Sequence, residues 1–122
     1  MLRRQERPIL VVDHDPTLRD VLVVALLLKG YPVREAANGS EALRLIEKSH
    51  PSLVVLDMQM PVLDGWGLSH ELKTKSLDPP VLAMTAGPDP ERSAQEIGAA
   101  DFLQKPFGIA DLLTKVEALR RA

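Results

Sequence analysis

Three short runs of apolar residues constrain the fold of this chain more than any other feature. The runs are ILVV at Ile9–Val12, LVVL at Leu53–Leu56 and VLAM at Val81–Met84. Within each run, apolar side chains follow one another without the polar alternation of a half-exposed strand. Continuous runs of this length are typical of strands buried on both faces, which occur in parallel sheets covered by helices. The runs therefore predict a parallel sheet at the centre of the domain.

Segments with helical signals separate these strands. An aspartate followed by proline is typical of a helix start, and glycine is typical of a helix end. The boundaries that we expect are Asp15-Pro16 and Lys29-Gly30 for the first helix, Ser40 as the cap of the second, and Asp89-Pro90 and Gly98 for the fourth.

Two weaker strands complete the pattern. The segment PVREA at 32–36 is more polar, and its proline suits the edge of a sheet. Phe102–Leu103 is a short apolar run, and apolar residues from Ile109 to Leu119 recur at helical spacing after it. Five strand–helix units with short connections predict an α/β fold, in which helices cover both faces of a parallel sheet.

The run VLVVALLL at Val21–Leu28 is apolar on nearly every side of the predicted first helix. A helix of this kind is usually buried between a sheet and its neighbours. We therefore expect it to be packed deeply in the domain. The other interpretation is an exposed apolar patch that binds a partner.

Length and composition restrict the class of protein. We expect the 122 residues to form one domain over residues 1–122, with residues 1–7 as a flexible tail. A net charge of -2 argues against nucleic-acid binding by electrostatic attraction. The chain has no cysteine, which excludes disulfides and thiolate metal sites, and its apolar runs are far shorter than the roughly 20 residues that span a membrane. We expect a cytoplasmic protein without membrane contact.

Polar side chains that can do chemistry follow four of the predicted strands. The carboxyl ends of parallel strands lie at one edge of the sheet, where ligands bind. A carboxylate there can form an aspartyl phosphate, neighbouring acids can hold Mg²⁺, and a hydroxyl and an ammonium can stabilise the transferred group. The residues are Asp13, His14 and Asp15 after the first strand, Asp57 after the third, Thr85 after the fourth and Lys105 after the fifth.

Four motifs contain these residues, and they occur in the order VVDHDP, LVVLDMQMPVLDG, MTA and KPF. Together they resemble the receiver domain of response regulators in bacterial two-component signalling, of the chemotaxis-regulator type. The resemblance covers nearly the whole chain, from Pro8 to the last helix. It implies a flavodoxin-like, three-layer α/β/α sandwich with five strands in the order 2-1-3-4-5.

The resemblance also implies a role for each matching side chain. Asp57 would be the phosphoacceptor, and Lys105 would contact the phosphoryl group. Thr85 would be the hydroxyl that moves on phosphorylation, and Phe102 the aromatic residue whose rotamer follows it. The bond between Lys105 and Pro106 would be cis.

The metal site is where the sequence departs from the family. The resemblance implies that Asp13, Asp57 and the backbone carbonyl of Gln59 bind Mg²⁺ or Mn²⁺, but His14 stands where the family usually has a second acid. Three interpretations stay open. The site binds Mg²⁺ weakly without the second acid; Asp15 replaces that acid; or the site has lost efficient phosphorylation or prefers another metal, to which His14 is a ligand. Imidazole suits zinc, copper or nickel better than Mg²⁺.

We expect a signalling domain rather than an enzyme, with self-phosphorylation and dephosphorylation as its only reactions. It would take a phosphoryl group from a histidine kinase or phosphotransfer protein and switch a surface that binds an effector protein or domain. A homodimer through the last two helical units stays open. The alternative is an interaction module that works without phosphorylation, because His14 impairs the metal site. A haloacid-dehalogenase-type hydrolase is disfavoured, because Gln59 stands where such enzymes have a second acid.

Overall fold

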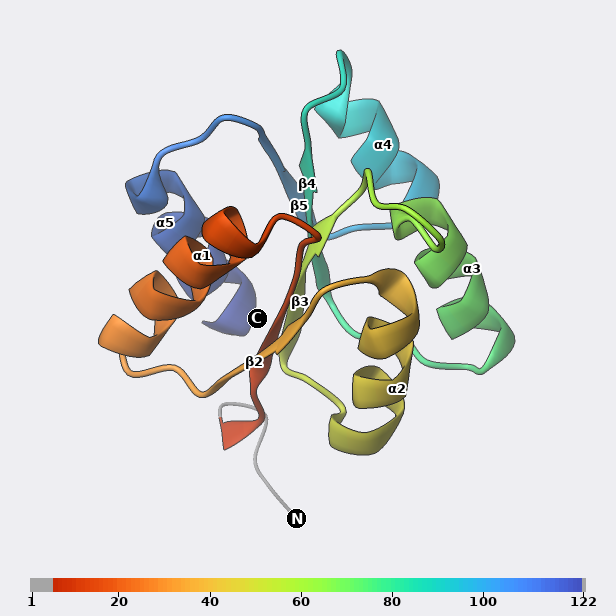
Figure 1. Ribbon diagram of the computed structural model, residues 1–122, viewed down its shortest axis with the longest axis horizontal. Helices are drawn as coiled ribbons and strands as arrows, with labels where there is room; N and C mark the ends of the chain where they lie inside the picture. Colours follow the sequence, from red (N-terminus) through yellow and green to blue (C-terminus); the bar gives the residue numbers. More distant parts are fainter. Residues whose placement is uncertain (1–5, 122) are drawn as a thin grey trace.

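The computed structural model describes residues 6–121, in which five strands alternate with five helices (Figure 1). Most of the predicted tail at 1–7 lies outside the described residues. No helix within residues 6–121 is long and apolar enough to cross a membrane. The elements are β1 (Ile9–Val12), α1 (Pro16–Leu28), β2 (Val33–Ala36), α2 (Gly39–Ser49), β3 (Leu53–Asp57), α3 (Gly65–Thr74), β4 (Val81–Thr85), α4 (Pro90–Ile97), β5 (Asp101–Gln104) and α5 (Ile109–Arg121).

The strands form one parallel sheet in the order β2-β1-β3-β4-β5, which confirms the predicted topology. β1 and β3 lie in the interior of the sheet, and every residue of both strands is buried. Their burial on both faces explains why their sequences lack polar alternation. β2 lies at one edge of the sheet and keeps two exposed positions, Arg34 and Glu35.

The helices form a layer on each side of the sheet, as predicted. Figure 1 shows α1 and α5 on one face and α2, α3 and α4 on the other. The core is correspondingly divided into two clusters. Leu22, Leu26 and Leu112 belong to the cluster beneath α1 and α5, whereas Ile46 and Leu68 belong to the cluster beneath the other three helices.

The helix boundaries follow the expected capping pattern with one correction. Asp15 and Asp89 cap α1 and α4, and Gly98 ends α4 in the left-handed conformation, as predicted. The prediction of Ser40 as the cap of α2 is wrong, because the side chain of Asn38 accepts the capping hydrogen bond from Glu41 N at 2.9 Å. The helix therefore begins at Gly39, which lies against Leu63 so closely that a Cβ atom would be 2.4 Å from the Leu63 carbonyl oxygen.

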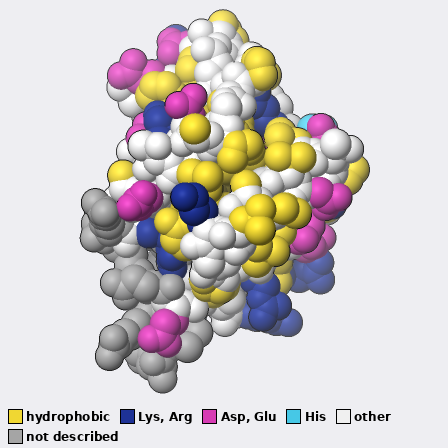
Figure 2. Space-filling model, turned by 90° about the vertical axis from the view of Figure 1, so that its left-hand side faces the viewer, with side chains coloured by type: hydrophobic (Ala, Val, Ile, Leu, Met, Phe, Trp, Pro, Cys, Tyr) yellow, Lys and Arg dark blue, Asp and Glu magenta, His cyan; other side chains and the backbone are white. Residues whose placement is uncertain are grey.

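The predicted deep burial of Val21–Leu28 is also wrong. Leu22 and Leu26 are buried, but Val24 is 53% exposed and Leu28 is 82% exposed. α1 lies in an outer layer, so only the stripe that faces the sheet and α5 is covered. Figure 2 shows hydrophobic side chains gathered on this face of the molecule. The apolar character of the outer side of α1 therefore does not serve the core of the domain.

Two substitutions in α1 separate buried from exposed leucines. Leu26→Ala removes a fully buried side chain and is expected to lower the free energy of unfolding by about 2–5 kcal/mol. Leu28→Ala is the matched control, and its effect should stay within about 0.5 kcal/mol. Urea denaturation of both variants measures the difference. Equal losses would contradict the exposure of Leu28.

Candidate functional site

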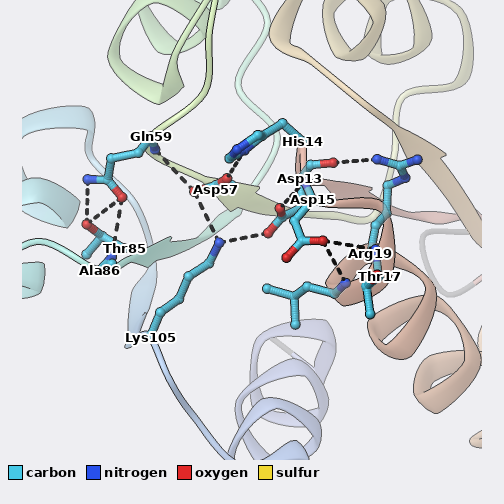
Figure 3. Close-up of polar contacts among 11 residues, drawn as sticks. Asp13, His14, Asp15, Thr17, Arg19, Asp57, Gln59, Thr85, Ala86 and Lys105 are labelled. Atoms are coloured by element: carbon cyan, nitrogen blue, oxygen red, sulfur yellow. Dashed lines mark hydrogen bonds and ion pairs between the residues drawn. The ribbon is translucent and has the colours of Figure 1, made fainter.

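Four strand ends bring the predicted site residues to one edge of the sheet (Figure 3). Asp57 and Thr85 are the last residues of β3 and β4. Asp13 and Lys105 continue the sheet beyond β1 and β5, because Asp13 N donates to Ala36 O at 3.2 Å and Lys105 N donates to Thr85 O at 2.8 Å. The backbone of the sheet therefore positions all four side chains. The peptide bond between Lys105 and Pro106 is cis, as the resemblance implied.

Asp13, Asp57 and Lys105 form the centre of the site. The two aspartates are 0% and 1% exposed, and the Lys105 side chain extends between them. Lys105 Nζ lies 2.9 Å from Asp13 Oδ2 and 3.4 Å from Asp57 Oδ1. Two buried carboxylates thus share one ammonium group.

Burial raises the pKa of the Asp57 carboxyl above its usual value of 3.8, and the neighbouring Asp13 raises it further. Lys105, the hydrogen bond from His14 and the N–H of Gln59 act in the opposite direction without cancelling the shift. The ionised form of Asp57 is disfavoured here because desolvation and a like charge outweigh one ammonium. The site therefore accommodates additional positive charge.

His14 lies beside Asp57 at the mouth of the site. Its Nδ1 atom is 3.2 Å from Asp57 Oδ2, and its side chain is 50% exposed. One ligand atom from each of Asp13, His14 and Asp57 lies within 4.8 Å of the others. Within residues 6–121 this is the group that could hold a metal ion, and its chemistry of two carboxylates and an imidazole fits a divalent cation.

Asp15 lies next to this group but has a structural task. Its Oδ1 accepts hydrogen bonds from Thr17 N and Leu18 N at 3.0 and 3.4 Å, which caps α1. Its own N–H donates to Asp13 Oδ1 at 2.9 Å and so orients the Asp13 carboxylate. The Asp15 carboxylate is not a member of the candidate metal group.

Gln59 connects the third and fourth strand ends through its side chain. Gln59 Nε2 donates to Thr85 Oγ1 at 2.7 Å, and Gln59 Oε1 lies 3.1 Å from the same hydroxyl. Oε1 also accepts from Ala86 N at 3.3 Å, and Gly87 N donates to Thr85 Oγ1 at 3.0 Å. The buried hydroxyl of Thr85 is therefore held by Gln59 in this structure.

Phe102 lies in β5, three residues before Lys105. It is partly buried against the core, and the ammonium of Lys115 lies 4.8 Å from the centroid of its ring. Lys115 Nζ also donates to Phe102 O at 2.6 Å and lies 3.0 Å from Asp101 Oδ1. The ring is thus joined to α5 through Lys115.

A comparison with known families identifies the domain. Residues 9–117 match the family model of the response regulator receiver domain. The chain belongs to this family. The match covers all five strands and most of the last helix, and receiver domains of two-component systems are signalling domains rather than enzymes of metabolism. It does not favour the alternative of an interaction module that works without phosphorylation.

Relatives and solved structures agree with this assignment. A probable transcriptional regulator, ycf27, from Porphyra purpurea is 44% identical over 99% of this chain, and the response regulator MprA from Mycobacterium sp. strain KMS is 44% identical over 93%. The receiver spans about half the length of these relatives, 51% and 50%. The receiver domain of the Francisella response regulator 1452 superposes with a TM-score of 0.86 at 29% identity, covering 94% of this chain and 97% of that one.

The response regulator TrrA from Thermotoga maritima, solved in complex with Mg²⁺ and beryllofluoride, also has the fold of this receiver. Its TM-score is 0.82 at 32% identity, and the match covers 93% of this chain and 98% of that chain. Receiver domains bind Mg²⁺ through acidic residues, and Asp13 and Asp57 belong to the candidate metal group of this receiver.

Sequence reasoning missed two polar contacts around this receiver site. Arg19 donates to Asp13 O at 2.7 Å and to Glu35 Oε1 at 3.0 Å, which ties α1 to the turn after β1. Arg19 lies four residues after Asp15, one helical turn into α1, and this spacing could have indicated that its side chain reaches back to the turn after β1. The Gln59 side chain is the second, and nothing in the sequence indicated that its amide would reach Thr85.

Removing the charge of Asp57 should stabilise this receiver. A raised pKa means that the folded state disfavours the ionised carboxylate, so ionisation lowers stability as the pH rises above the usual value of 3.8. Asp57→Asn should therefore unfold at a higher temperature than the wild type at pH 7 in metal-free buffer, and the gain should shrink as the pH is lowered towards 4. Thermal melts measure both effects.

The control for this comparison is Asp78→Asn, which changes an exposed acid outside the site and should leave the melting temperature nearly unchanged. A lower melting temperature for Asp57→Asn at pH 7 would contradict the account, because it would mean that Lys105 more than compensates for burial.

Proposed function

We propose that this receiver accepts a phosphoryl group on Asp57. The observation that supports this role is a carboxylate that is 1% exposed, lies at the end of β3 and has Lys105 Nζ 3.4 Å from its Oδ1. A carboxylate in this setting can attack phosphorus, and a fixed ammonium offsets the charge of the transferred group. Asp13, at 2.9 Å, keeps Lys105 in place.

The proposed transfer forms a bond from a carboxylate oxygen of Asp57 to phosphorus while the bond from phosphorus to the donor's imidazole nitrogen breaks. The leaving nitrogen keeps the electron pair, and Asp57 becomes an aspartyl phosphate. Lys105 stabilises the phosphoryl oxygens during the transfer. A divalent cation held by Asp13, Asp57 and the backbone carbonyl of Gln59 would offset further negative charge. Self-phosphorylation and later hydrolysis of the acyl phosphate are the only reactions that we assign to the domain.

We propose that phosphorylation is read out through Thr85 and Phe102. The hydroxyl of Thr85 has to leave Gln59, which it contacts at 2.7 Å, before it can reach a phosphoryl oxygen. Its movement would give Phe102 room to turn inward and so change the surface formed by α4, β5 and α5. Phe102 carries no hydroxyl, so it acts through packing alone.

The proposed phosphodonor is a histidine kinase or a phosphotransfer protein. An apolar hollow lined by Leu18, Ala86, Lys105, Pro106 and Phe107 borders the site and suits the approach of such a donor. The proposed recipient of the signal is an effector protein or domain. We place this one domain in the cytoplasm and assign it no nucleic-acid contact, in line with its net charge of -2.

Intact-mass measurement after incubation with acetyl phosphate tests the assignment of Asp57. Separate reactions contain Mg²⁺, Mn²⁺ or Co²⁺, because the proposal requires a divalent cation without depending on which one. The wild type should gain the mass of one phosphoryl group in at least one reaction. Asp57→Asn, which preserves the shape of the side chain, should gain none. The proposal is wrong if folded wild-type protein stays unmodified in all three reactions or if Asp57→Asn is modified equally.

The contact between Gln59 and Thr85 predicts a second measurable effect. If Gln59 holds Thr85 away from the phosphoryl group, Gln59→Ala should bind the phosphoryl mimic beryllofluoride more tightly. Loss of one neutral hydrogen bond, about 1 kcal/mol, corresponds to about fivefold in affinity. A titration in saturating divalent cation measures the change.

Gln104→Ala is the matched control, since the Gln104 side chain donates to Gly87 O at 3.3 Å. Gln104 lies opposite Thr85 in the sheet, but the described hydrogen bonds of the Thr85 hydroxyl are with Gln59 and Gly87 N. It should bind beryllofluoride with wild-type affinity. Weaker binding by Gln59→Ala would show that Gln59 supports the phosphorylated state instead of opposing it.

A further inference from the structure

The three candidate ligands of the site do not share one chemistry. Asp13 and Asp57 offer carboxylate oxygens from 0% and 1% exposed side chains, whereas His14 offers a ring nitrogen from a side chain that is 50% exposed. Figure 3 shows the His14 ring beside the Asp57 carboxylate, on the side away from Lys105. The opening of the site towards solvent is therefore lined by an imidazole.

The position of the imidazole matches that of a ligand. Two atoms that each lie about 2.1 Å from one ion are about 3.0 Å apart at a right angle and about 3.4 Å apart at a tetrahedral angle. His14 Nδ1 and Asp57 Oδ2 are 3.2 Å apart, which lies between these values. Both atoms can thus bind one ion with little movement, in place of the hydrogen bond that they now make.

The donor set favours one class of cation over another. Mg²⁺ is a hard ion that prefers near-octahedral oxygen ligands, and it gains little from an imidazole. Divalent zinc, cobalt and nickel accept mixed imidazole and carboxylate ligands readily. Lys105 Nζ also lies 2.9 Å from Asp13 and 3.4 Å from Asp57, and this neighbouring ammonium weakens a purely electrostatic hold on Mg²⁺.

We propose that His14 is a metal ligand and that it shifts the preference of this receiver from Mg²⁺ towards borderline divalent ions of the zinc, cobalt and nickel class. The inference deepens the proposed function and rests on it for the position of the cation, which Asp13 and Asp57 hold together with His14. Its consequence is that Co²⁺ supports phosphorylation of this receiver at lower concentration than Mg²⁺ does.

Calorimetric titration of metal-free protein with Co²⁺ and with Mg²⁺ tests the inference without any phosphodonor. The quantity of interest is the ratio of the two affinities, because most protein sites bind Co²⁺ more tightly than Mg²⁺. His14→Asp exchanges the imidazole for a carboxylate, so it should weaken Co²⁺ and strengthen Mg²⁺ binding. We expect the ratio of Co²⁺ to Mg²⁺ affinity to fall at least about tenfold. Even the loss of a residue that only hydrogen-bonds to a metal ligand lowers metal affinity by about this much.

His70→Asp makes the same exchange on the exposed side of α3 and is the matched control. It should leave the ratio of affinities at its wild-type value. Proton NMR of the Co²⁺-loaded protein provides a direct signature, because an imidazole bound through Nδ1 keeps an exchangeable Nε2 proton that the ion shifts far downfield. This resonance should be present in the wild type and in His70→Asp and absent in His14→Asp.

The inference is overturned if His14→Asp leaves the ratio of affinities unchanged, or if the shifted resonance survives in that variant. An equal effect of His70→Asp would also overturn it, because it would indicate adventitious binding to surface histidines. These results are independent of phosphorylation. A receiver that binds Co²⁺ through His14 but never gains a phosphoryl group would refute the proposed function and leave this inference standing. If His14→Asp instead leaves both phosphorylation with Mg²⁺ and the ratio of affinities unchanged, this inference is refuted and the proposed function stands.

Discussion

The burial of two carboxylates beside a single ammonium is the constraint on which this structure depends. Asp13 and Asp57 are almost fully removed from solvent, and Lys105 is within 2.9 and 3.4 Å of them. Burial, and after it the neighbouring Asp13, raise the pKa of Asp57 more than Lys105 and the two hydrogen bonds lower it. A site in this condition gains stability from a bound cation. That is the property a phosphoacceptor needs when a negatively charged group arrives.

The sheet makes this costly arrangement feasible. The carboxyl ends of β1, β3, β4 and β5 lie side by side, so residues 13, 57, 85 and 105 meet although the sequence separates them widely. Two sets of hydrogen bonds, from Asp15 and from Arg19, hold the turn after β1. Asp15 caps α1 with its carboxylate and orients Asp13 with its N–H, and Arg19 binds the Asp13 carbonyl oxygen. Hydrogen bonds from the start of α1 therefore hold both the Asp13 carboxylate and the turn that carries it.

The parallel sheet and the gathering of polar side chains at one edge of it could be predicted from the sequence because both follow from strong local patterns, whereas the strand order was implied by the resemblance to receiver domains. Continuous apolar runs mark strands buried on both faces, and parallel topology brings whatever follows them to one edge. The two wrong predictions, the cap of α2 and the burial of Val21–Leu28, concern features that the local sequence pattern does not determine. Asn38 and Ser40 are both good caps, and in the structure it is Asn38 that accepts the hydrogen bond from Glu41 N. A helix that is apolar on all sides, such as Val21–Leu28, does not reveal which side is covered.

The contacts of His14 and Gln59 were beyond sequence reasoning for a related reason. Position in the chain indicates which residues lie near a site but not which atoms meet. The 3.2 Å approach of His14 to Asp57 and the amide of Gln59 on Thr85 depend on side-chain rotamers, which the surrounding packing selects.

The central claim is that Asp57 itself carries the phosphoryl group in a site built from buried carboxylates. Borohydride reduction of the phosphorylated protein, followed by peptide mass spectrometry, locates an acyl phosphate because it converts the modified aspartate to homoserine. The account predicts homoserine at position 57 alone. Homoserine at position 13 or 15, or an unreduced phosphoryl group on His14, would contradict it.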